Sequence, residues 1–327
     1  MAVKTYIEAI REAMRDEMRR DERVIVMGED VGIKGGVFKA TDGLFKEFGE
    51  MRVIDTPLAE SGIVGVAIGA AINGLRPIAE IQFQDFIMPA VDQIISEAAK
   101  IRYRSNGDFG VPMVVRAPFG GGVHGALYHS QSMEAMFCHV PGLKVVVPST
   151  PYDAKGLLRA AVRDPDPVLY FEHKRAYRLV KGEVPDDEYT VRIGAASVVR
   201  EGDDIAVFTY GLMTHYCLQA AEALAGDGFE CEVVDLRTLR PLDRATIVAT
   251  ARRCGKVLVV QEANLAVSVA SEVAAIVAED CFEHLDAPVR RLGGPEVPAV
   301  PFSPPLEEFY MITPAKIEQA LRDLAAY

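Results

Sequence analysis

The sequence of 327 residues lacks three features that mark common classes of protein. Its five cysteines never form a C-x-x-C pair, so neither a disulfide framework nor a zinc site is predicted. Basic residues number 35 against 47 acidic ones, and the net charge of -12 argues against a nucleic-acid partner. The longest apolar run, 63–72, is about half of what a membrane-spanning helix needs.

The N-terminal stretch also lacks the apolar core of a signal peptide. Residues 1–24 interleave acidic and basic side chains with apolar ones at helical spacing. We therefore expect a soluble, cytoplasmic protein with no membrane segment and with reduced cysteines. Half of the residues are hydrophobic, so a chain of this length can bury a large core, and two domains are expected.

Short β-rich runs alternate with helical patterns in the first half of the chain. The runs are RVIVMG (23–28), MRVIDT (51–56), RPIAEIQF (76–83), VPMVVRAP (111–118) and LKVVVPS (143–149). This alternation is typical of a parallel sheet covered by helices, and nearly continuous apolar strands fit burial on both faces. The pattern predicts an α/β domain over residues 1–180.

The second half repeats this alternation after a polar interval. From about 175 to 202 the chain loses helical periodicity, which indicates a connector that we place at 181–200. Strand and helix patterns then resume and predict a smaller α/β domain over residues 201–327. Within it, the proline-rich segment 293–317 is expected to run over the surface before a last helix.

A glycine-rich loop follows a buried strand and carries two of the six histidines. The sequence APFGGGVHGALYHSQS includes Gly120 to Gly122, Gly125, His124 and His129. Glycines at the carboxyl end of a parallel strand let the backbone approach a ligand, and a histidine there can exchange protons near neutral pH. The loop has neither a phosphate-loop motif nor a G-x-G-x-x-G that opens a helix, and no nucleophile elbow supports a hydrolase.

One carboxylate, Glu60, stands between a short apolar strand and a helix of small residues in VIDTPLAESGIVGVAIGAAINGL (53–75). An acid at a helix start is ordinary, because the unpaired amides there favour negative charge. A helix rich in glycine and alanine can also pack closely and leave its first residue little water, which suits a functional acid. The role of Phe86 is left with two alternatives in the same way, since an aromatic side chain there is either part of the core or a face for a planar ligand.

Seven motifs taken together resemble the β subunit of the thiamine-diphosphate-dependent 2-oxoacid dehydrogenases. They are GED (28–30), DTPLAESGIVG (55–65), AEIQFQDFIMPAVDQI (79–94), HGALYHSQS (124–132), PSTPYDAKGLL (148–158), YFEHKRAYR (170–178) and VVDLRTLRPLD (233–243). The resemblance spans nearly the whole chain and is closest to the branched-chain, 2-oxoisovalerate type. It implies a pyrimidine-binding α/β domain followed by a transketolase C-terminal-like domain.

The resemblance implies oxidative decarboxylation of a 2-oxoacid, with acyl transfer to a lipoyl-lysine of an acyltransferase core. An α subunit would hold the magnesium and the diphosphate in an α2β2 heterotetramer, while this chain would grip the aminopyrimidine end of thiamine diphosphate. A basic domain of the core would suit the negative charge of this chain. The alternatives are a pyruvate or acetoin dehydrogenase β subunit, a noncatalytic assembly subunit, or a nicotinamide-linked oxidoreductase using the Gly120 to Gly125 loop.

The same resemblance assigns residues to the aminopyrimidine site. Glu60 matches the catalytic acid that hydrogen-bonds the ring nitrogen, so that the neighbouring nitrogen can remove the thiazolium proton. Phe86 matches the aromatic that packs on the ring, and Gln82 a neighbour that lines the pocket. Glu29 matches a carboxylate near the same site. A charge-assisted hydrogen bond of this kind is worth more where water is excluded.

Two further assignments come from the resemblance. His129 matches a catalytic histidine at the reactive thiazolium side, where it would assist acyl transfer to lipoamide, and His124 is expected to be structural. A structural potassium ion would be held by the carbonyls of Met113, Ala161, Val162 and Asp166 and by the side chain of Asp164. Oxygen ligands suit such a cation, although the segment Asp164 to Pro167 also reads as a plain turn.

Overall fold

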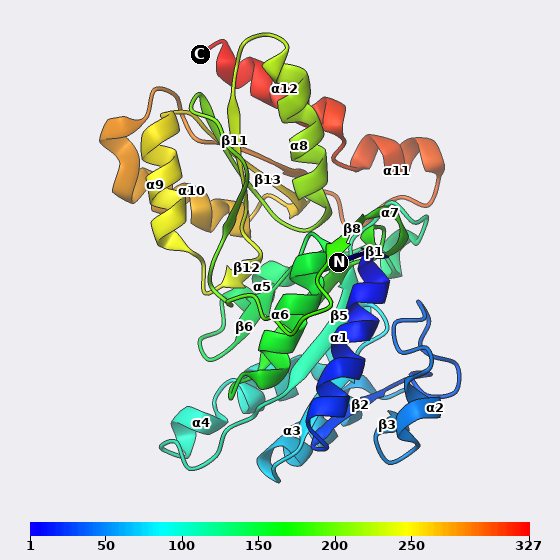
Figure 1. The fold of residues 1–327 in the computed structure, drawn as a ribbon. Coiled ribbons are helices and arrows are strands. Elements are labelled where there is room, and N and C mark those ends of the chain that lie inside the picture. Colours follow the sequence, from blue (N-terminus) through cyan, green and yellow to red (C-terminus); the bar gives the residue numbers. More distant parts are fainter. The chain divides into compact units, whose positions relative to one another are not determined.

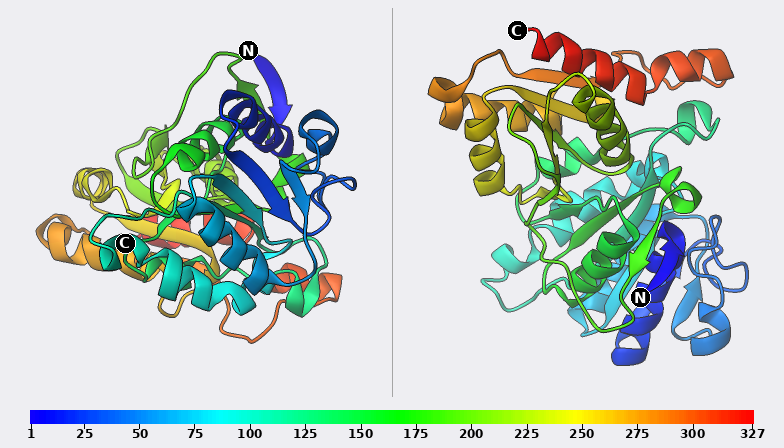
Figure 2. Two further views of the ribbon diagram at one scale, coloured as in Figure 1. Left: turned by 90° about the horizontal axis from the view of Figure 1, so that it is seen from below. Right: turned by 45° about the horizontal axis from the view of Figure 1, so that its top comes forward.

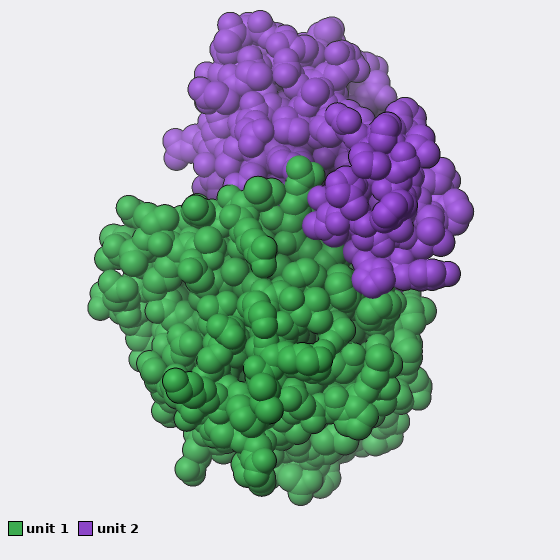
Figure 3. Space-filling view, turned by 90° about the vertical axis from the view of Figure 1, so that its right-hand side faces the viewer, with its two compact units in different colours: residues 1–119, 136–193 green, residues 120–135, 194–327 purple.

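The computed structural model describes residues 1–327 and divides into two compact units. Unit 1 comprises residues 1–119 and 136–193, and unit 2 comprises residues 120–135 and 194–327, as coloured in Figure 3. The glycine-rich loop therefore folds with unit 2, although the strands before and after it in the chain belong to unit 1.

A parallel sheet forms the centre of unit 1. Six of its strands follow the order β6-β7-β5-β4-β2-β3. Every residue of β2 and β5 is buried, as the apolar runs predicted, and every residue of β7 is buried as well. The bounds are β2 (Val24–Gly28), β3 (Val53–Asp55), β4 (Arg76–Glu80), β5 (Val114–Phe119), β6 (Lys144–Val146) and β7 (Val168–His173), and β1 (Ala2–Thr5) pairs with β8 (Lys181–Val184) in a small antiparallel sheet.

Helices cover both faces of this sheet. Figure 1 and Figure 2 show α1 and α6 side by side on one face, with α3 and the adjoining helical turns on the other. Helix α1 begins in a capping box of Thr5 and Glu8. The helices and helical turns between β1 and β8 are α1 (Tyr6–Arg20), α2 (Leu44–Phe48), α3 (Glu60–Ile72), η1 (Gln84–Ala90), η2 (Gln93–Ala98), α4 (Ile101–Arg104), η3 (Ala126–Tyr128), α5 (Glu134–Cys138), α6 (Pro151–Arg163) and α7 (Ala176–Leu179).

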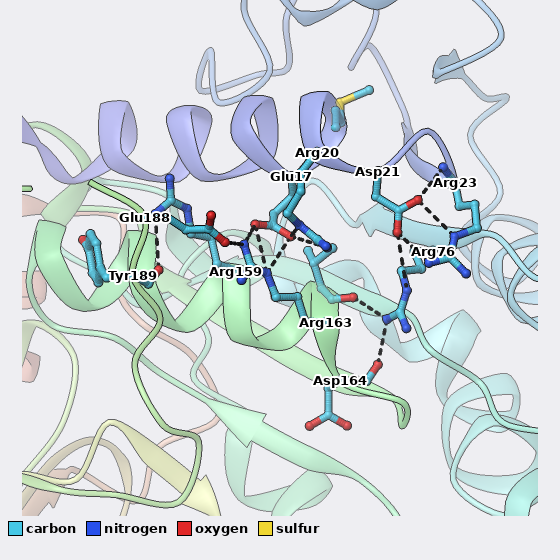
Figure 4. A network of polar contacts seen from close by, with 12 residues as sticks. Glu17, Arg20, Asp21, Arg23, Arg76, Arg159, Arg163, Asp164, Glu188 and Tyr189 are labelled. Atoms are coloured by element: carbon cyan, nitrogen blue, oxygen red, sulfur yellow. Dashed lines mark hydrogen bonds and ion pairs between the residues drawn. The ribbon is translucent and has the colours of Figure 1, made fainter. Parts of the chain in front are cut away.

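Ion pairs join α1 to α6, as Figure 4 shows. The carboxylate of Glu17 on α1 is 1% exposed and lies 2.6 Å from Arg163 of α6 and 2.8 Å from Arg20. Arg163 also reaches Glu188 at 2.7 Å. Because a buried carboxylate is costly unless it is paired, these arginines are needed for the two helices to pack here.

A second set of charges lies inside the sheet of unit 1. The guanidinium of Arg116 is fully buried and donates to Glu80 at 2.6 Å and to both oxygens of Glu172 at 2.6 Å. The hydroxyl of Tyr177 donates to the same carboxylate of Glu172 at 2.5 Å. Burial raises the pKa of Glu80 and Arg116 counteracts that rise. The network joins β4, β5, β7 and α7.

Unit 2 has its own sheet, with strands in the order β14-β13-β10-β11-β9. Only β9 is antiparallel to its neighbour. Helices α8 and α12 pack together, as do α9 and α10. The bounds are β9 (Ser197–Arg200), β10 (Ile205–Thr209), α8 (Leu212–Ala225), β11 (Cys231–Asp235), β12 (Thr238–Arg240), α9 (Arg244–Cys254), β13 (Val257–Asn264), α10 (Val269–Cys281), η4 (Phe282–His284), β14 (Arg290–Gly294), α11 (Pro304–Tyr310) and α12 (Pro314–Ala325).

The structure refines two expectations. The proline-rich segment 293–317 contains a short helix, α11, whose first turn accepts proline because that turn needs no backbone N–H donor. All five cysteines are free, and four of them are buried. Helices long and apolar enough to cross a bilayer are absent.

The buried network gives a stability prediction for Arg116→Met. The change leaves two carboxylates in the core without their cation, and it should lower the free energy of unfolding by about 3–5 kcal/mol. Chemical denaturation at pH 7 measures the loss. The control Arg104→Met removes an exposed pair with Glu97 (side chains 68% and 45% exposed) and should change stability by less than about 1 kcal/mol. Equal losses in the two variants would contradict the assignment.

Candidate active site

Three neighbouring strands of unit 1 end at the same level. Gly28 at the end of β2 pairs with Asp55 at the end of β3 and with Glu80 at the end of β4. Because the strands are parallel, the segments that follow them leave the sheet at one edge, which is where open α/β sheets bind ligands. Glu29 lies directly after β2 and Gln82 shortly after β4, and Glu60 begins the helix that follows β3.

The side chains of Glu29 and Glu60 lie close enough to interact. Partial burial raises the pKa of Glu29, and the negative charges of Glu60 and Asp30 raise it further. The amide nitrogen of Gln82 lies 3.5 Å from the backbone carbonyl of Glu29. Three of the residues assigned by the resemblance are thus brought together. A pair of neighbouring carboxylates is stabilised by a ligand that offers a hydrogen-bond donor between them.

Phe86 stands on the helical turn η1 and remains partly exposed. Its ring contacts the ring of Phe83 edge to face, with 5.5 Å between the ring centroids. The rings of Phe83 and Phe38 contact each other in the same manner, with 5.3 Å between their centroids. A partly exposed aromatic ring that is held by its neighbours suits stacking with a planar ligand. Phe86 thus joins an aromatic cluster without being fully buried, and its role as a face for a planar ligand stays a prediction.

The loop after β2 is tied to the end of β3. The N–H of Gly32 donates to the carboxylate of Asp55 at 2.6 Å, and a Cβ at this position would lie 2.5 Å from that carboxylate. The N–H of Thr56 donates to the carbonyl of Gly28 at 2.9 Å. These contacts fix the backbone on either side of Glu29 and upstream of Glu60.

Thr56 is a candidate that the sequence analysis missed. Its hydroxyl oxygen is buried and has no hydrogen-bond partner. A buried hydroxyl without a partner is costly, so a polar group of a bound ligand is its natural complement. The signal was present in the sequence, because Thr56 follows β3 within the motif that contains Glu60.

Helix α3 departs from the expected close packing. Its buried face is formed by Ile63, Val64, Ala67, Ile68 and Ala71. On the other face, a Cβ at Gly69 would meet nothing within 4 Å, and Val66 is 61% exposed. Within this chain the small residues leave that face open, and Glu60 is half-buried rather than sheltered.

His129 lies on segment 120–135, which belongs to unit 2, whereas Glu29, Glu60, Gln82 and Phe86 belong to unit 1. His129 follows the turn η3 and is half-buried. The imidazole of His124 is 58% exposed, and its Nδ1 lies 2.6 Å from the carboxylate of Glu307 on α11. This pairing is what a structural histidine would make.

A buried acid that the sequence analysis did not single out, Glu134, ends the same segment. It is fully buried and accepts a hydrogen bond from the hydroxyl of Tyr210 at 2.6 Å. Burial raises the pKa of Glu134 to about 7, with a further contribution from the negative charge of Glu262, against the hydrogen bond from Tyr210.

Most of the oxygens assigned to potassium already have partners within unit 1. The ammonium of Lys144 donates to both oxygens of Asp164 at 2.6 and 2.7 Å, and Arg76 donates to the carbonyl of Val162 at 2.7 Å. Arg102 pairs with Asp166. The carboxylates of Asp164 and Asp166 are therefore neutralised by basic side chains. The assigned oxygens fit potassium only through the remaining lone pairs of the backbone carbonyls, including those of Met113 and Ala161.

Comparison with known families matches both parts of the chain. Residues 3–180 match the transketolase pyrimidine-binding domain and residues 194–317 match the transketolase C-terminal domain. A solved split-gene transketolase, described as an inactive β4 tetramer, superposes with a TM-score of 0.80 at 24% identity, covering 98% of each chain. The predicted fold class is confirmed.

Curated relatives are similar over most of their length. The chain is 65% identical to the 2-oxoisovalerate dehydrogenase subunit beta of Bacillus subtilis (strain 168), covering all of both chains. It is 51% identical to the pyruvate dehydrogenase E1 component subunit beta of the same strain, covering 93% of each. The corresponding Staphylococcus epidermidis (strain RP62A) protein is 49% identical over 89% of this chain and 90% of its own.

The raised pKa of Glu134, about 7, gives a pH prediction. The folded state keeps this proton at pH values where the unfolded chain releases it, so its contribution to stability is lost as the pH rises through about 5 to 7. Glu134→Gln should remove a slope of up to ~1.4 kcal/mol per pH unit from the free energy of unfolding. Denaturation at several pH values measures the difference between the variants. Glu308→Gln, an exposed acid, should keep the slope, and a parallel loss of slope would contradict the assignment.

Proposed function

The chain belongs to the family of 2-oxoacid dehydrogenase β subunits, which includes those of 2-oxoisovalerate and pyruvate dehydrogenases, and we propose that it serves oxidative decarboxylation of a branched-chain 2-oxoacid. The resemblance seen in the motifs is thereby confirmed. The branched-chain substrate is supported by the higher identity to the 2-oxoisovalerate relative, 65% against 51%. A pyruvate or acetoin substrate is the alternative within the family.

One observation carries the proposal. Glu29, Glu60 and Gln82 meet at the ends of three parallel strands, within the part matched by the pyrimidine-binding domain. The cofactor that this arrangement suits is thiamine diphosphate. The residues present fit its aminopyrimidine end, because they offer carboxylates, an amide, a partly exposed ring and the unpaired hydroxyl of Thr56.

Each side chain has a task that follows from its chemistry. Thiamine diphosphate, when bound, supplies a carbon centre that stabilises negative charge. The carboxylate of Glu60 accepts a hydrogen bond from the protonated ring nitrogen and stabilises its charge. Phe86 orients the ring by stacking, and Gln82 limits its movement in the plane. His129 donates a proton or hydrogen bond during acyl transfer to the lipoyl group.

The parts of the reaction that this chain does not supply come from partner proteins. We infer that an α subunit holds the magnesium and the diphosphate, and that two chains of each kind form an α2β2 heterotetramer. A lipoyl-bearing acyltransferase core accepts the acyl group. The structural potassium remains part of the proposal, and no chemical step depends on it.

The proposal predicts a strict dependence on the α subunit. The purified chain should show almost no decarboxylation, and addition of a cognate α subunit, thiamine diphosphate and magnesium should restore it. The restored enzyme should turn over 2-oxoisovalerate with a higher kcat/KM than pyruvate, measured by carbon dioxide release. Full activity of the chain alone would contradict the subunit assignment, and preference for pyruvate would contradict the substrate.

A substitution of Glu60 separates an enzyme subunit from a noncatalytic assembly subunit. In the reconstituted complex, Glu60→Gln should lower kcat by roughly 100-fold or more, because the amide cannot stabilise the charged ring nitrogen. The matched control is Glu50→Gln, an exposed acid, which should retain wild-type rates. An unchanged rate in Glu60→Gln, with complex formation intact by gel filtration, would favour the assembly role.

A further inference from the structure

Two buried acids hold the segment 120–131, here called the glycine loop, from elsewhere in unit 2. The N–H of Gly121 donates to Glu262 at 2.6 Å. The N–H groups of Gly122 and His124 both donate to one oxygen of Glu307, at 3.0 and 3.2 Å. Glu262, in β13, is 6% exposed, and Glu307, on α11, is 3% exposed. Hydrogen bonds to carboxylates are about twice as strong as neutral ones, so these contacts restrain the backbone firmly.

The glycine loop needs such restraint. His124 and Ala126 have positive φ values of 56° and 53°, a left-handed conformation that costs non-glycine residues roughly 1–3 kcal/mol each. A cavity of about 100 Å³ is lined by residues 130–133 together with Glu262 and other side chains. The end of the loop therefore lacks packing atoms on one side. The hydrogen bonds to Glu262 and Glu307 therefore add to the restraint on its conformation.

The restrained backbone contacts His129 directly. A Cβ added at Gly125 would lie 2.8 Å from both the Cβ and the carbonyl oxygen of His129, and 2.9 Å from the hydroxyl of Ser130. The loop is closed by a hydrogen bond of 3.1 Å from the N–H of Gly120 to the carbonyl of Gln131. A shift of residues 121–125 must therefore move His129.

We propose that Glu307 and Glu262 are positioning residues, which set the location of His129 by holding the backbone of the glycine loop. The inference rests on the proposed role of His129 in acyl transfer. Glu307 makes an additional contact to the loop, since its second oxygen lies 2.6 Å from the imidazole of His124. Two acids of unit 2, including one on the short helix α11, thereby control the rate of acyl transfer without contacting the reacting atoms.

The test uses the reconstituted complex and two assays. Decarboxylation is followed with an artificial electron acceptor, and acyl transfer is followed with a free lipoyl domain. Glu307→Ala should lower kcat for acyl transfer by ~10–100-fold, the range expected when a catalytic group is displaced by about 1 Å. The KM for the 2-oxoacid and the rate with the artificial acceptor should change less than about twofold. Glu307→Gln keeps an acceptor oxygen and should recover most of the rate, and the neighbouring exposed Glu308→Ala should match the wild type.

A double-mutant cycle separates positioning from a general structural role. In the His129→Ala background, Glu307→Ala should cause no further loss of acyl transfer, because its effect passes through His129. An additive loss would overturn the inference. If His129→Ala alone leaves acyl transfer unchanged in an active complex, the proposed role of His129 fails, and that failure is distinguishable from failure of the positioning role.

Gly125→Ala provides a second route if Glu307→Ala folds poorly. Gly125 has a φ of -83°, so alanine fits the backbone dihedrals, and the added Cβ displaces its neighbours His129 and Ser130. Acyl transfer should fall as in Glu307→Ala, with decarboxylation retained. Wild-type acyl transfer in both Gly125→Ala and a folded Glu307→Ala or Glu262→Ala complex would overturn the inference.

Discussion

The buried guanidinium of Arg116 is the interaction on which the architecture of unit 1 depends. It is fully enclosed by the sheet and pairs with Glu80 and Glu172, which lie on the two strands beside its own. A buried ion pair has strict geometric requirements, because each charge is costly wherever its partner is out of reach. The network therefore fixes the relative register of β4, β5 and β7. The strand ends that carry Gln82 and, through β2, Glu29 take their positions from this register.

Acidic side chains in the two units have different tasks because their surroundings differ. Glu29 and Glu60 lie near each other at the edge of a sheet, where burial and then the charge of Glu60 raise the pKa of Glu29. Glu134 is enclosed, and burial raises its pKa to about 7, so that it keeps its proton at pH values below that. Glu262 and Glu307 accept hydrogen bonds from backbone N–H groups and so hold a loop in place. Sequence position alone does not distinguish these environments.

Much of the fold could be predicted from local pattern. Apolar runs located β2 to β6 to within a few residues, because strands buried on both faces are mostly apolar. The meeting of Glu29 and Gln82 follows from the same argument, since both leave parallel strands at one edge. The resemblance supplied the roles of Glu60, Phe86 and His129, and these roles remain predictions.

Long-range partners could not be predicted in the same way. Glu80, Arg116 and Glu172 lie far apart in the sequence, and only the three-dimensional register of their strands pairs them. The grouping of the glycine loop with unit 2 depends on Glu262 and Glu307, which lie more than a hundred residues later. The pairing of Lys144 with Asp164 likewise needs β6 to lie near the end of α6. The pattern of residues within a short stretch of the sequence carries no information about such contacts.

The assignment of residues 120–135 to unit 2 means that the backbone crosses between the two units three times, at residues 119–120, 135–136 and 193–194. A single cut in the connector would thus not yield two complete domains. The N-terminal fragment would retain the glycine loop but lose Glu262 and Glu307, while the C-terminal fragment would lose a segment of its own fold. Expression of this polypeptide as two separate halves, cut in the connector, would therefore divide unit 2 between the two fragments.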